Sequence, residues 1–178
     1  MQWLNEPGEW CFEDNRITVK SDPRTDFWRR THNNLVRDNG HFYYQEVSGD
    51  FLVEVKLSGK FADLYDQAGL MVRLDAETWI KCGIEFVNGV KLLSAVITRD
   101  WSDWSVQPLD NPMCVWLRLV RHAGTLEVSY SSDGNKFSLY RQGFLTDALT
   151  LQAGIMIASP TGEGFAAIFE ALSINGLA

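Results

Sequence analysis

Hydrogen-bonding side chains alternate with apolar ones along residues 67–85, and a tryptophan stands among them. The members of this polar set are Gln67, Arg73, Trp79, Lys81 and Glu85. A tryptophan ring can stack on the C–H face of a sugar, while amide, charged and carboxylate groups bond to the hydroxyls. These residue types predict a surface that binds a carbohydrate or a sugar metabolite, with Trp79 exposed on it as the stacking platform.

The run from residue 98 to residue 105 adds candidates for the same surface. Thr98 belongs to the same polar face, Asp100 would bond to hydroxyls, and Trp101 or Trp104 would close one edge. A loop at 26–32 could form a rim. A solvated sheet face that carries a ladder of charges is the alternative interpretation of these residues, and both stay open.

An enzyme that acts on a carbohydrate, such as a glycoside hydrolase, lyase or isomerase, is a second hypothesis. Glycoside hydrolysis requires two carboxylates about 5–9.5 Å apart. In the register described below, Glu85 and Asp100 lie about 27 Å apart at the rise of an extended strand. These two residues therefore cannot be the catalytic pair, and the sequence assigns no catalytic residue.

Charge and cysteine usage limit the partners and the compartment. The formal net charge of −7 disfavours nucleic acid and anionic membranes as partners. Cys11, Cys82 and Cys114 are odd in number and far apart, unlike a disulfide framework or a zinc site, and we expect no metal and no cofactor. The opening residues lack a secretory pattern, so we expect a cytoplasmic protein.

Short alternating runs bounded by Gly, Asn, Asp or Pro recur along the chain, and no long window repeats with a helical period. They predict one domain, residues 1–178, built as an all-β antiparallel sandwich or barrel. The stretch 23–34 lacks strand character, and a short helix or turn is expected at 146–149. The predicted strands are 10–13, 17–20, 42–47, 51–59, 67–74, 79–87, 90–100, 102–107, 115–122, 126–131, 137–142, 151–158 and 165–174.

One turn fixes the register of the central hairpin. The dipeptide Asn88-Gly89 predicts a two-residue type I′ turn. This register sets Trp79, Lys81 and Glu85 on one side and a wholly apolar core face on the other. For the preceding strand two registers remain: Arg73 opposite Trp79, a cation–π geometry, or Arg73 opposite Lys81, which is repulsive. The apolar pairs of the core face are Ile80 with Ile97, Cys82 with Ala95, and Ile84 with Leu93.

The runs 64–73, 79–85 and 94–105 resemble the domain of unknown function 1349 (DUF1349) family, whose fungal members are called regulators of enolase. Residues 116–118 and 132–134 also resemble the family's pattern, so the resemblance spans nearly the whole chain. It implies a concanavalin A-like jelly roll whose polar face is the concave one, where relatives of this fold bind sugars. It supplies no established activity, because fold alone does not carry function.

The main hypothesis is a non-catalytic carbohydrate- or sugar-metabolite-binding regulatory module that uses this concave face. The fungal family name adds a third hypothesis, a protein-interaction regulator of sugar metabolism, which would have a protein partner. The sequence specifies no oligomeric state.

Overall fold

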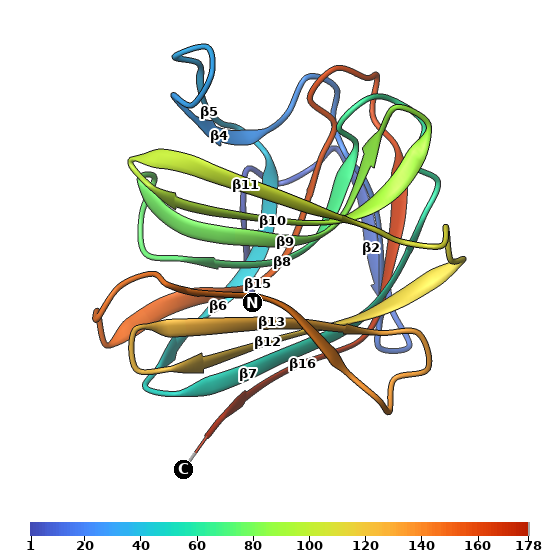
Figure 1. Cartoon of the computed structure of the whole chain (residues 1–178). Helices are drawn as coiled ribbons and strands as arrows, with labels where there is room; N and C mark the ends of the chain where they lie inside the picture. The colour runs from blue at the N-terminus through green and yellow to red at the C-terminus, as the bar shows by residue number, and fades with distance from the viewer. Residues whose placement is uncertain (178) are drawn as a thin grey trace.

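The computed structural model describes residues 1–177, and sixteen strands run through them in three sheets (Figure 1). The first sheet has seven strands in the spatial order β1-β6-β15-β8-β9-β10-β11. Neighbouring strands are antiparallel throughout this sheet. Their bounds are β1 (Gln2–Leu4), β6 (His41–Ser48), β15 (Thr150–Ala158), β8 (Gln67–Arg73), β9 (Thr78–Val87), β10 (Val90–Arg99) and β11 (Trp101–Pro108).

The second sheet also has seven antiparallel strands, in the order β14-β13-β12-β7-β16-β3-β2. It lies face to face with the first sheet (Figure 1). The predicted all-β antiparallel sandwich of the jelly-roll type is therefore confirmed. The bounds are β14 (Ser138–Phe144), β13 (Thr125–Ser131), β12 (Cys114–His122), β7 (Phe51–Gly59), β16 (Ala166–Gly176), β3 (Arg16–Lys20) and β2 (Glu9–Glu13).

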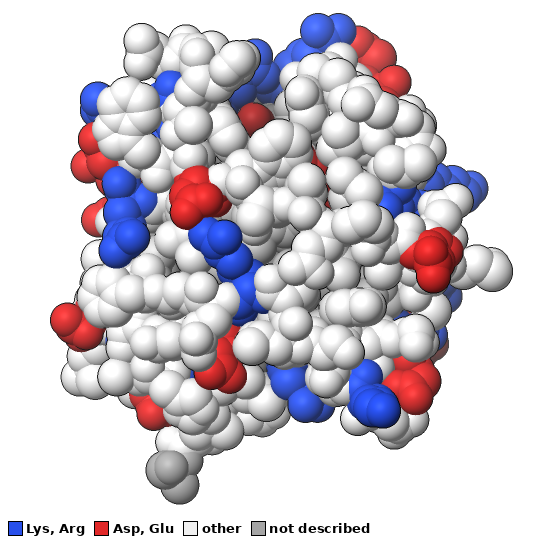
Figure 2. Space-filling view, viewed as in Figure 1, with Lys and Arg blue, Asp and Glu red and all other residues white. Residues whose placement is uncertain are grey.

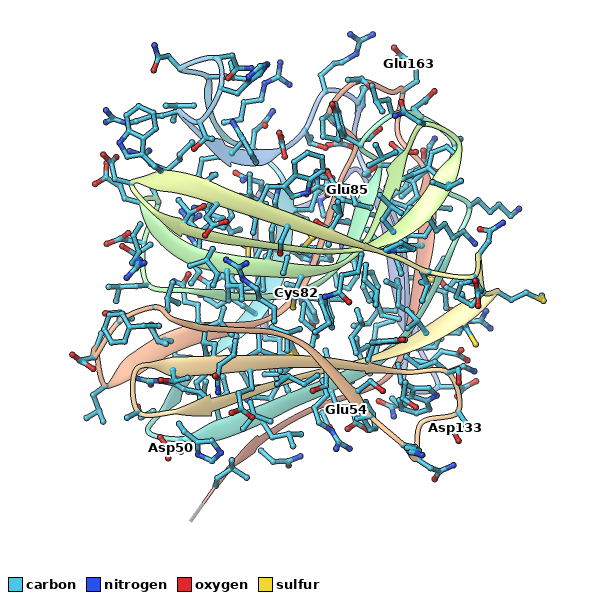
Figure 3. The ribbon with its side chains drawn as sticks, viewed as in Figure 1. Asp50, Glu54, Cys82, Glu85, Asp133 and Glu163 are labelled. Carbon is cyan, nitrogen blue, oxygen red and sulfur yellow. The ribbon has the colours of Figure 1, made fainter. Side chains whose placement is uncertain are left out.

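Alternation of side chains explains how the two sheets pack. In β7, every second residue from Phe51 to Leu57 is buried, and the residues between them are partly exposed. In β9, Ile80, Cys82 and Ile84 face the same core from the first sheet. Figure 3 shows Cys82 between the sheets and Glu85 on the other side of the first sheet. The core thus lies between the sheets and leaves the outer face of the first sheet for other contacts.

The predicted hairpin register is confirmed. Asn88 and Gly89 have positive φ values of 51° and 85°, as a type I′ turn requires. The three apolar pairs across β9 and β10 form as expected and are buried. Of the two registers left open for β8, the structure has Arg73 opposite Trp79.

The outer face of the first sheet is covered by a segment that the sequence did not reveal as strand. The third sheet pairs β4 (Phe27–Arg29) with β5 (Val36–Asp38), and it projects at one end of the sandwich (Figure 1). We call residues 26–38 the covering segment. They help to bury a second apolar cluster, so β8 is buried on both faces. The members of the second apolar cluster are Phe27, Phe42, Tyr44, Met71, Trp79, Val96, Met156 and Ala158.

Every predicted strand occurs, with ends that differ by at most two residues. Three strands of three residues each, β1, β4 and β5, were missed. The expectation that 23–34 lacks strand is wrong at β4, and residues 146–149 are irregular rather than helical. Three residues are too few for a period-two pattern to be recognised, which explains the omissions. Across residues 1–177, no helix has the length and apolar character needed to cross a membrane.

Charged side chains of both signs are interspersed over the face shown in Figure 2, without a broad area of one sign. The 23 acidic and 16 basic residues of the sequence are thus not segregated by sign on this face.

Candidate functional site

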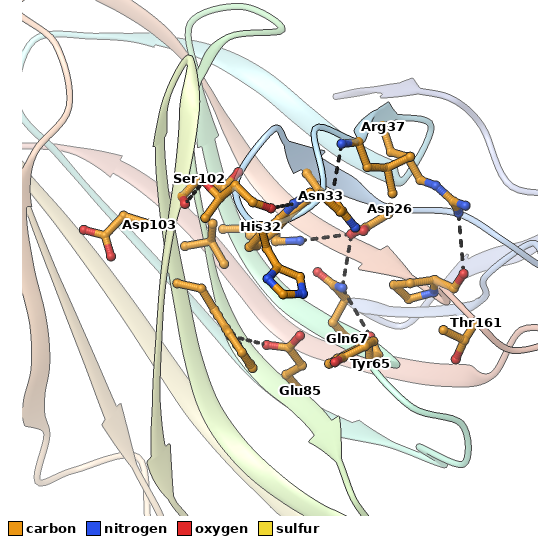
Figure 4. A pocket seen from close by; sticks show the side chains of 17 residues that line it. Asp26, His32, Asn33, Arg37, Tyr65, Gln67, Glu85, Ser102, Asp103 and Thr161 are labelled. Carbon is orange, nitrogen blue, oxygen red and sulfur yellow. Dashed lines mark hydrogen bonds and ion pairs between the residues drawn. The ribbon is translucent and has the colours of Figure 1, made fainter.

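A pocket of about 740 Å³ lies between the outer face of the first sheet and the covering segment (Figure 4). Strands β8, β9 and β10 supply its floor, and β11 supplies one wall. The covering segment and the chain near residues 65 and 160 complete the wall. The lining residues are Asp26, Trp28, Thr31, His32, Asn33, Leu35, Arg37, Tyr65, Gln67, Lys81, Glu85, Val96, Ser102, Asp103, Trp104, Pro160 and Thr161.

Lys81 is the buried cation at the floor of this pocket. Its Nζ lies 3.1 Å from Oδ1 of Asp26 and donates to the backbone carbonyl of Phe27 at 2.5 Å. The same Oδ1 accepts a hydrogen bond from the side-chain amide of Gln67 at 3.3 Å. Because both charges are largely removed from water, each compensates the other, and the pair attaches the covering segment to β9.

Glu85 is the second acidic group at the floor, and only 6% of the residue is exposed. Its Oε2 accepts a hydrogen bond of 2.8 Å from Nε1 of Trp104, which also lies 3.2 Å from the hydroxyl of Ser94. Burial raises the pKa of Glu85, and Lys81, Ser94 and Trp104 oppose that shift by favouring the charged carboxylate. The indole thus orients a carboxyl group toward the pocket.

Aromatic rings form the wall above these polar groups. Tyr65 and Trp104 meet edge to face, with ring centroids 6.3 Å apart and an interplanar angle of 83°. Trp28 holds its indole in place by donating from Nε1 to the carbonyl of Thr31 at 3.0 Å. The pocket therefore combines ring surfaces with buried hydrogen-bonding groups, the combination that small polar ligands need.

His32 reaches the pocket from a tightly folded part of the covering segment. Its φ is 77°, in the left-handed region, and Arg30 and Asn34 have φ values of 59° and 55°. In Figure 4 the His32 ring points into the pocket, toward the space above Glu85 and Gln67. Backbone conformations of this kind cost free energy and persist where the surrounding contacts hold them.

Those contacts come from Arg29 and Ser102. The guanidinium of Arg29 donates to Asp100 and Glu77, both at 2.8 Å, and its backbone N–H donates to Oγ of Ser102 at 3.0 Å. Hydrogen bonding to Asp100 raises the pKa of Arg29. Thr31 donates to the carbonyl of Ser102 at 2.6 Å. The covering segment is thereby fastened to β11 and to the turn before β9.

The expectation of an exposed Trp79 is wrong. Trp79 is 0% exposed, and its ring packs edge to face on Phe27 with centroids 6.3 Å apart. Nζ of Lys81 lies 5.7 Å from the Trp79 ring centroid. Arg73 is likewise buried and engaged, because it donates two hydrogen bonds to the carboxylate of Asp38, at 2.6 and 2.8 Å. These two side chains support the covering segment and cannot contact a ligand in the pocket.

Three further candidates lie outside the pocket. Thr98 is buried and exchanges a hydrogen bond of 2.9 Å with Ser102. Asp100 is occupied by Arg29 and lies 3.1 Å from Nε of Arg30. Trp101 is 53% exposed on β11. Asp100 therefore acts on the pocket only through the covering segment.

Gln67, Lys81, Glu85 and Trp104 are the predicted residues that the structure brings together in the pocket. Sequence reasoning missed Asp26, Trp28 and most of the covering segment, although it marked 26–32 as a possible rim. The paired aromatic residues at 27–28, in a stretch without strand alternation, were the available signal. Tyr65 and Thr161 gave no signal, because their position depends on contacts between distant parts of the chain.

The carboxylates that share the pocket are Asp26, Glu85 and Asp103, rather than the rejected pair of Glu85 and Asp100. Asp103 is paired with Arg141 at 2.9 Å. Within residues 1–177, no group of three or more His, Cys, Asp or Glu side chains is arranged to hold a metal ion. The arrangement can accept hydrogen bonds at its floor and offer ring faces at its wall.

The family model described as "Protein of unknown function (DUF1349)" matches residues 3–177. The chain is also 36% identical over 174 residues to "Regulation of enolase protein 1" from Saccharomyces cerevisiae, a match that covers 97% of this chain and 88% of that protein.

Three solved structures with similar folds are compared with this chain, and the first of them is also similar in sequence. A functionally unknown protein from Saccharomyces cerevisiae matches with a TM-score of 0.95 and 35% identity, over 99% of this chain and 96% of that one. A GH43 protein from Bacillus licheniformis matches at 0.76 and 15% identity, over 97% of this chain but 36% of that one. The carbohydrate binding module CBM66 from Bacillus subtilis matches at 0.63 and 14% identity, over 98% and 95%. At these low identities the two bacterial proteins show the fold alone.

Proposed function

The chain belongs to the DUF1349 family, and we propose that it is a non-catalytic, regulatory module that binds a carbohydrate or sugar metabolite in the pocket under the covering segment. The ligand ring lies against Trp104 and Tyr65, and its hydroxyls bond to Gln67, Lys81 and Glu85. This assignment keeps the ligand class expected from the sequence but moves the stacking platform from Trp79 to Trp104.

One observation carries the proposal: the floor holds hydrogen-bonding atoms that the fold leaves unused, beneath aromatic rings. Oδ2 of Asp26, Oε1 of Glu85 and Oε1 of Gln67 accept no hydrogen bond from residues 1–177 and are not sealed from solvent. Acceptors that open into a pocket can take donors from a ligand, and sugar hydroxyls supply several of them from one small ring.

Two of the comparisons support this choice. The curated relative is named for regulation, and the CBM66 structure is named as a carbohydrate binding module. A binding module with a regulatory role agrees with both names. We place the ligand in this pocket because of the free acceptors at its floor and the aromatic rings above them.

Thermal-shift measurements with neutral monosaccharides (glucose, galactose, xylose, arabinose and fructose) test the proposal. A sugar at about one hundred times its dissociation constant stabilises the fold by roughly 2.7 kcal/mol, which is readily measured. The informative variant is Trp104→Ala, and Trp101→Ala is its matched control on the same strand. We expect the shift to vanish in the first variant and to persist in the second.

Two results would contradict the proposal. A shift that survives Trp104→Ala but disappears in Trp101→Ala would place the ligand outside the pocket. Absence of a shift with every sugar of the panel, in a protein with an intact unfolding transition, would reject carbohydrate binding.

A further inference from the structure

The charges around the pocket floor bear on which sugars can enter. Among residues 1–177, Glu85 faces the pocket and forms no ion pair, although Lys81, the partner of Asp26, also favours its charged form. Its bonded partners are the neutral groups of Trp104 and Ser94. Asp26 is compensated by Lys81, and Asp103 by Arg141. The floor therefore has an excess of negative charge when Glu85 is ionised.

The Lys and Arg side chains that line the pocket, Lys81 and Arg37, each use part of their donors within the protein. Lys81 uses two of its three donor positions on Asp26 and on the carbonyl of Phe27. Arg37 donates to the backbone carbonyls of Arg24 and Pro160, at the edge of the pocket (Figure 4). Arg37 uses only Nη1 for these bonds, and Figure 4 places it at the edge of the pocket, away from Glu85 on the floor.

The unused atoms at the floor favour ligands that donate hydrogen bonds. With the carboxyl groups ionised, Oε1 of Glu85, Oδ2 of Asp26 and Oε1 of Gln67 only accept hydrogen bonds, whereas Lys81 keeps one N–H for a ligand oxygen. A hydroxyl group can serve both kinds of partner, because it donates and accepts. A phosphate or carboxylate would bring acceptors to acceptors and a negative charge toward Glu85, where burial weakens solvent screening.

From this arrangement, and on the basis of the function proposed above, we infer that the pocket binds sugars that carry no anionic group and rejects phosphorylated or carboxylated ones. Glu85 is the residue that sets this selectivity: it accepts hydrogen bonds from ligand hydroxyls and repels anions. The site thus recognises the free sugar rather than its phosphorylated or oxidised derivatives.

Isothermal titration calorimetry with matched ligands tests the inference. The sets are glucose with glucose 1-phosphate, glucose 6-phosphate and glucuronate, and galactose with galacturonate. We expect each neutral member that binds to do so at least tenfold more tightly than its anionic derivatives. The Glu85→Gln variant keeps the size of the side chain. In this variant the ratio of the dissociation constant of the anionic derivative to that of the neutral sugar should shrink toward one.

Glu46→Gln is the control, because Glu46 is exposed on the same sheet and lies outside the pocket. This variant should keep the wild-type ratio. An anionic derivative that binds wild-type protein as tightly as its neutral partner overturns the inference and leaves the proposed function intact. An unchanged ratio in Glu85→Gln overturns the role of Glu85. Failure of every ligand of these sets and of every other sugar in the thermal-shift panel overturns the proposed function itself.

Discussion

At the scale of single residues, the contact between Trp104 and Glu85 links structure to the proposed binding. The indole donates to Oε2 of Glu85 and leaves Oε1 for the pocket, while its ring meets Tyr65. One side chain therefore orients an acceptor and supplies a ring surface. This double role explains why Trp104, rather than the more exposed Trp101, is the residue on which we expect binding to depend.

Glu85 also gives a prediction about pH. Burial raises its pKa in the folded protein, so the folded state binds more protons than the unfolded state above the ordinary pKa of a glutamate. Stability linked to this group is therefore fully present below that ordinary value and is lost as pH rises through the folded pKa. Glu85→Gln removes this loss, so its stability relative to wild type should increase as pH rises.

Urea denaturation of both proteins between about pH 5 and 8 checks the sign. Asp133 does not interfere, because hydrogen bonds from Lys136, Asn135 and Ser131 lower its pKa to about 2. Glu46→Gln, at an exposed position outside the pocket, is the control variant. A Glu85→Gln difference that falls with rising pH would contradict the assigned direction.

At the scale of elements, the covering segment creates the pocket, and Arg29 fastens it. Arg29→Ala removes hydrogen bonds to Asp100 and Glu77. We expect a loss of about 2 kcal/mol, at the lower end for bonds to charged groups, because both acidic partners are partly exposed. We also expect weaker sugar binding and faster proteolytic cleavage within residues 26–38.

Limited proteolysis followed by mass spectrometry locates the cleavage. Arg24→Ala is the control, because Arg24 pairs with Glu163 in an exposed ion pair near the same segment. This control should resist cleavage as wild type does. Equal resistance in Arg29→Ala would mean that other contacts hold the covering segment.

Alternation along the strands made most of the sandwich predictable, since Val53, Val55 and Leu57 in β7 or Ile80 and Ile84 in β9 mark one buried face each. The register of β9 with β10 was also predictable from a local feature. The two-residue turn at Asn88 and Gly89 determines which residues of the two strands pair.

The covering segment was not predictable by this means. Phe27 covers Trp79, which lies far along the chain, and a period-two pattern shows which side a residue faces but not what lies against it. Trp79, Arg73 and Thr98 were therefore assigned to the correct face of the sheet and to the wrong environment. Gln67, Lys81, Glu85 and Trp104 share that face and remain beside open space.

At the scale of the whole molecule, the chain passes repeatedly between the two large sheets. It runs from β6 in the first sheet to β7 in the second and to β8 in the first, and later from β15 to β16. Both sheets contribute to one apolar core. Neither sheet can bury its apolar face alone, so the one-domain prediction requires a single cooperative unfolding transition.

Calorimetry and circular dichroism test this cooperativity. The calorimetric enthalpy should equal the van't Hoff enthalpy, at about 125 kcal/mol near 60 °C for a chain of this length. Tryptophan fluorescence and far-ultraviolet circular dichroism should report the same midpoint. Two separate transitions would mean that part of the chain folds independently.

The central claim is that a sugar binds in the pocket beside Trp104, and nuclear magnetic resonance tests it most directly. The measurement is a titration of ¹⁵N-labelled protein with the tightest-binding neutral sugar, following the indole N–H signals of the seven tryptophans. Tryptophan-to-phenylalanine variants assign these signals. We predict a saturable shift at Trp104, with Trp101 and the buried Trp79 unchanged. Saturable shifts at Trp101 without a change at Trp104, or no shift with any sugar, would contradict the claim.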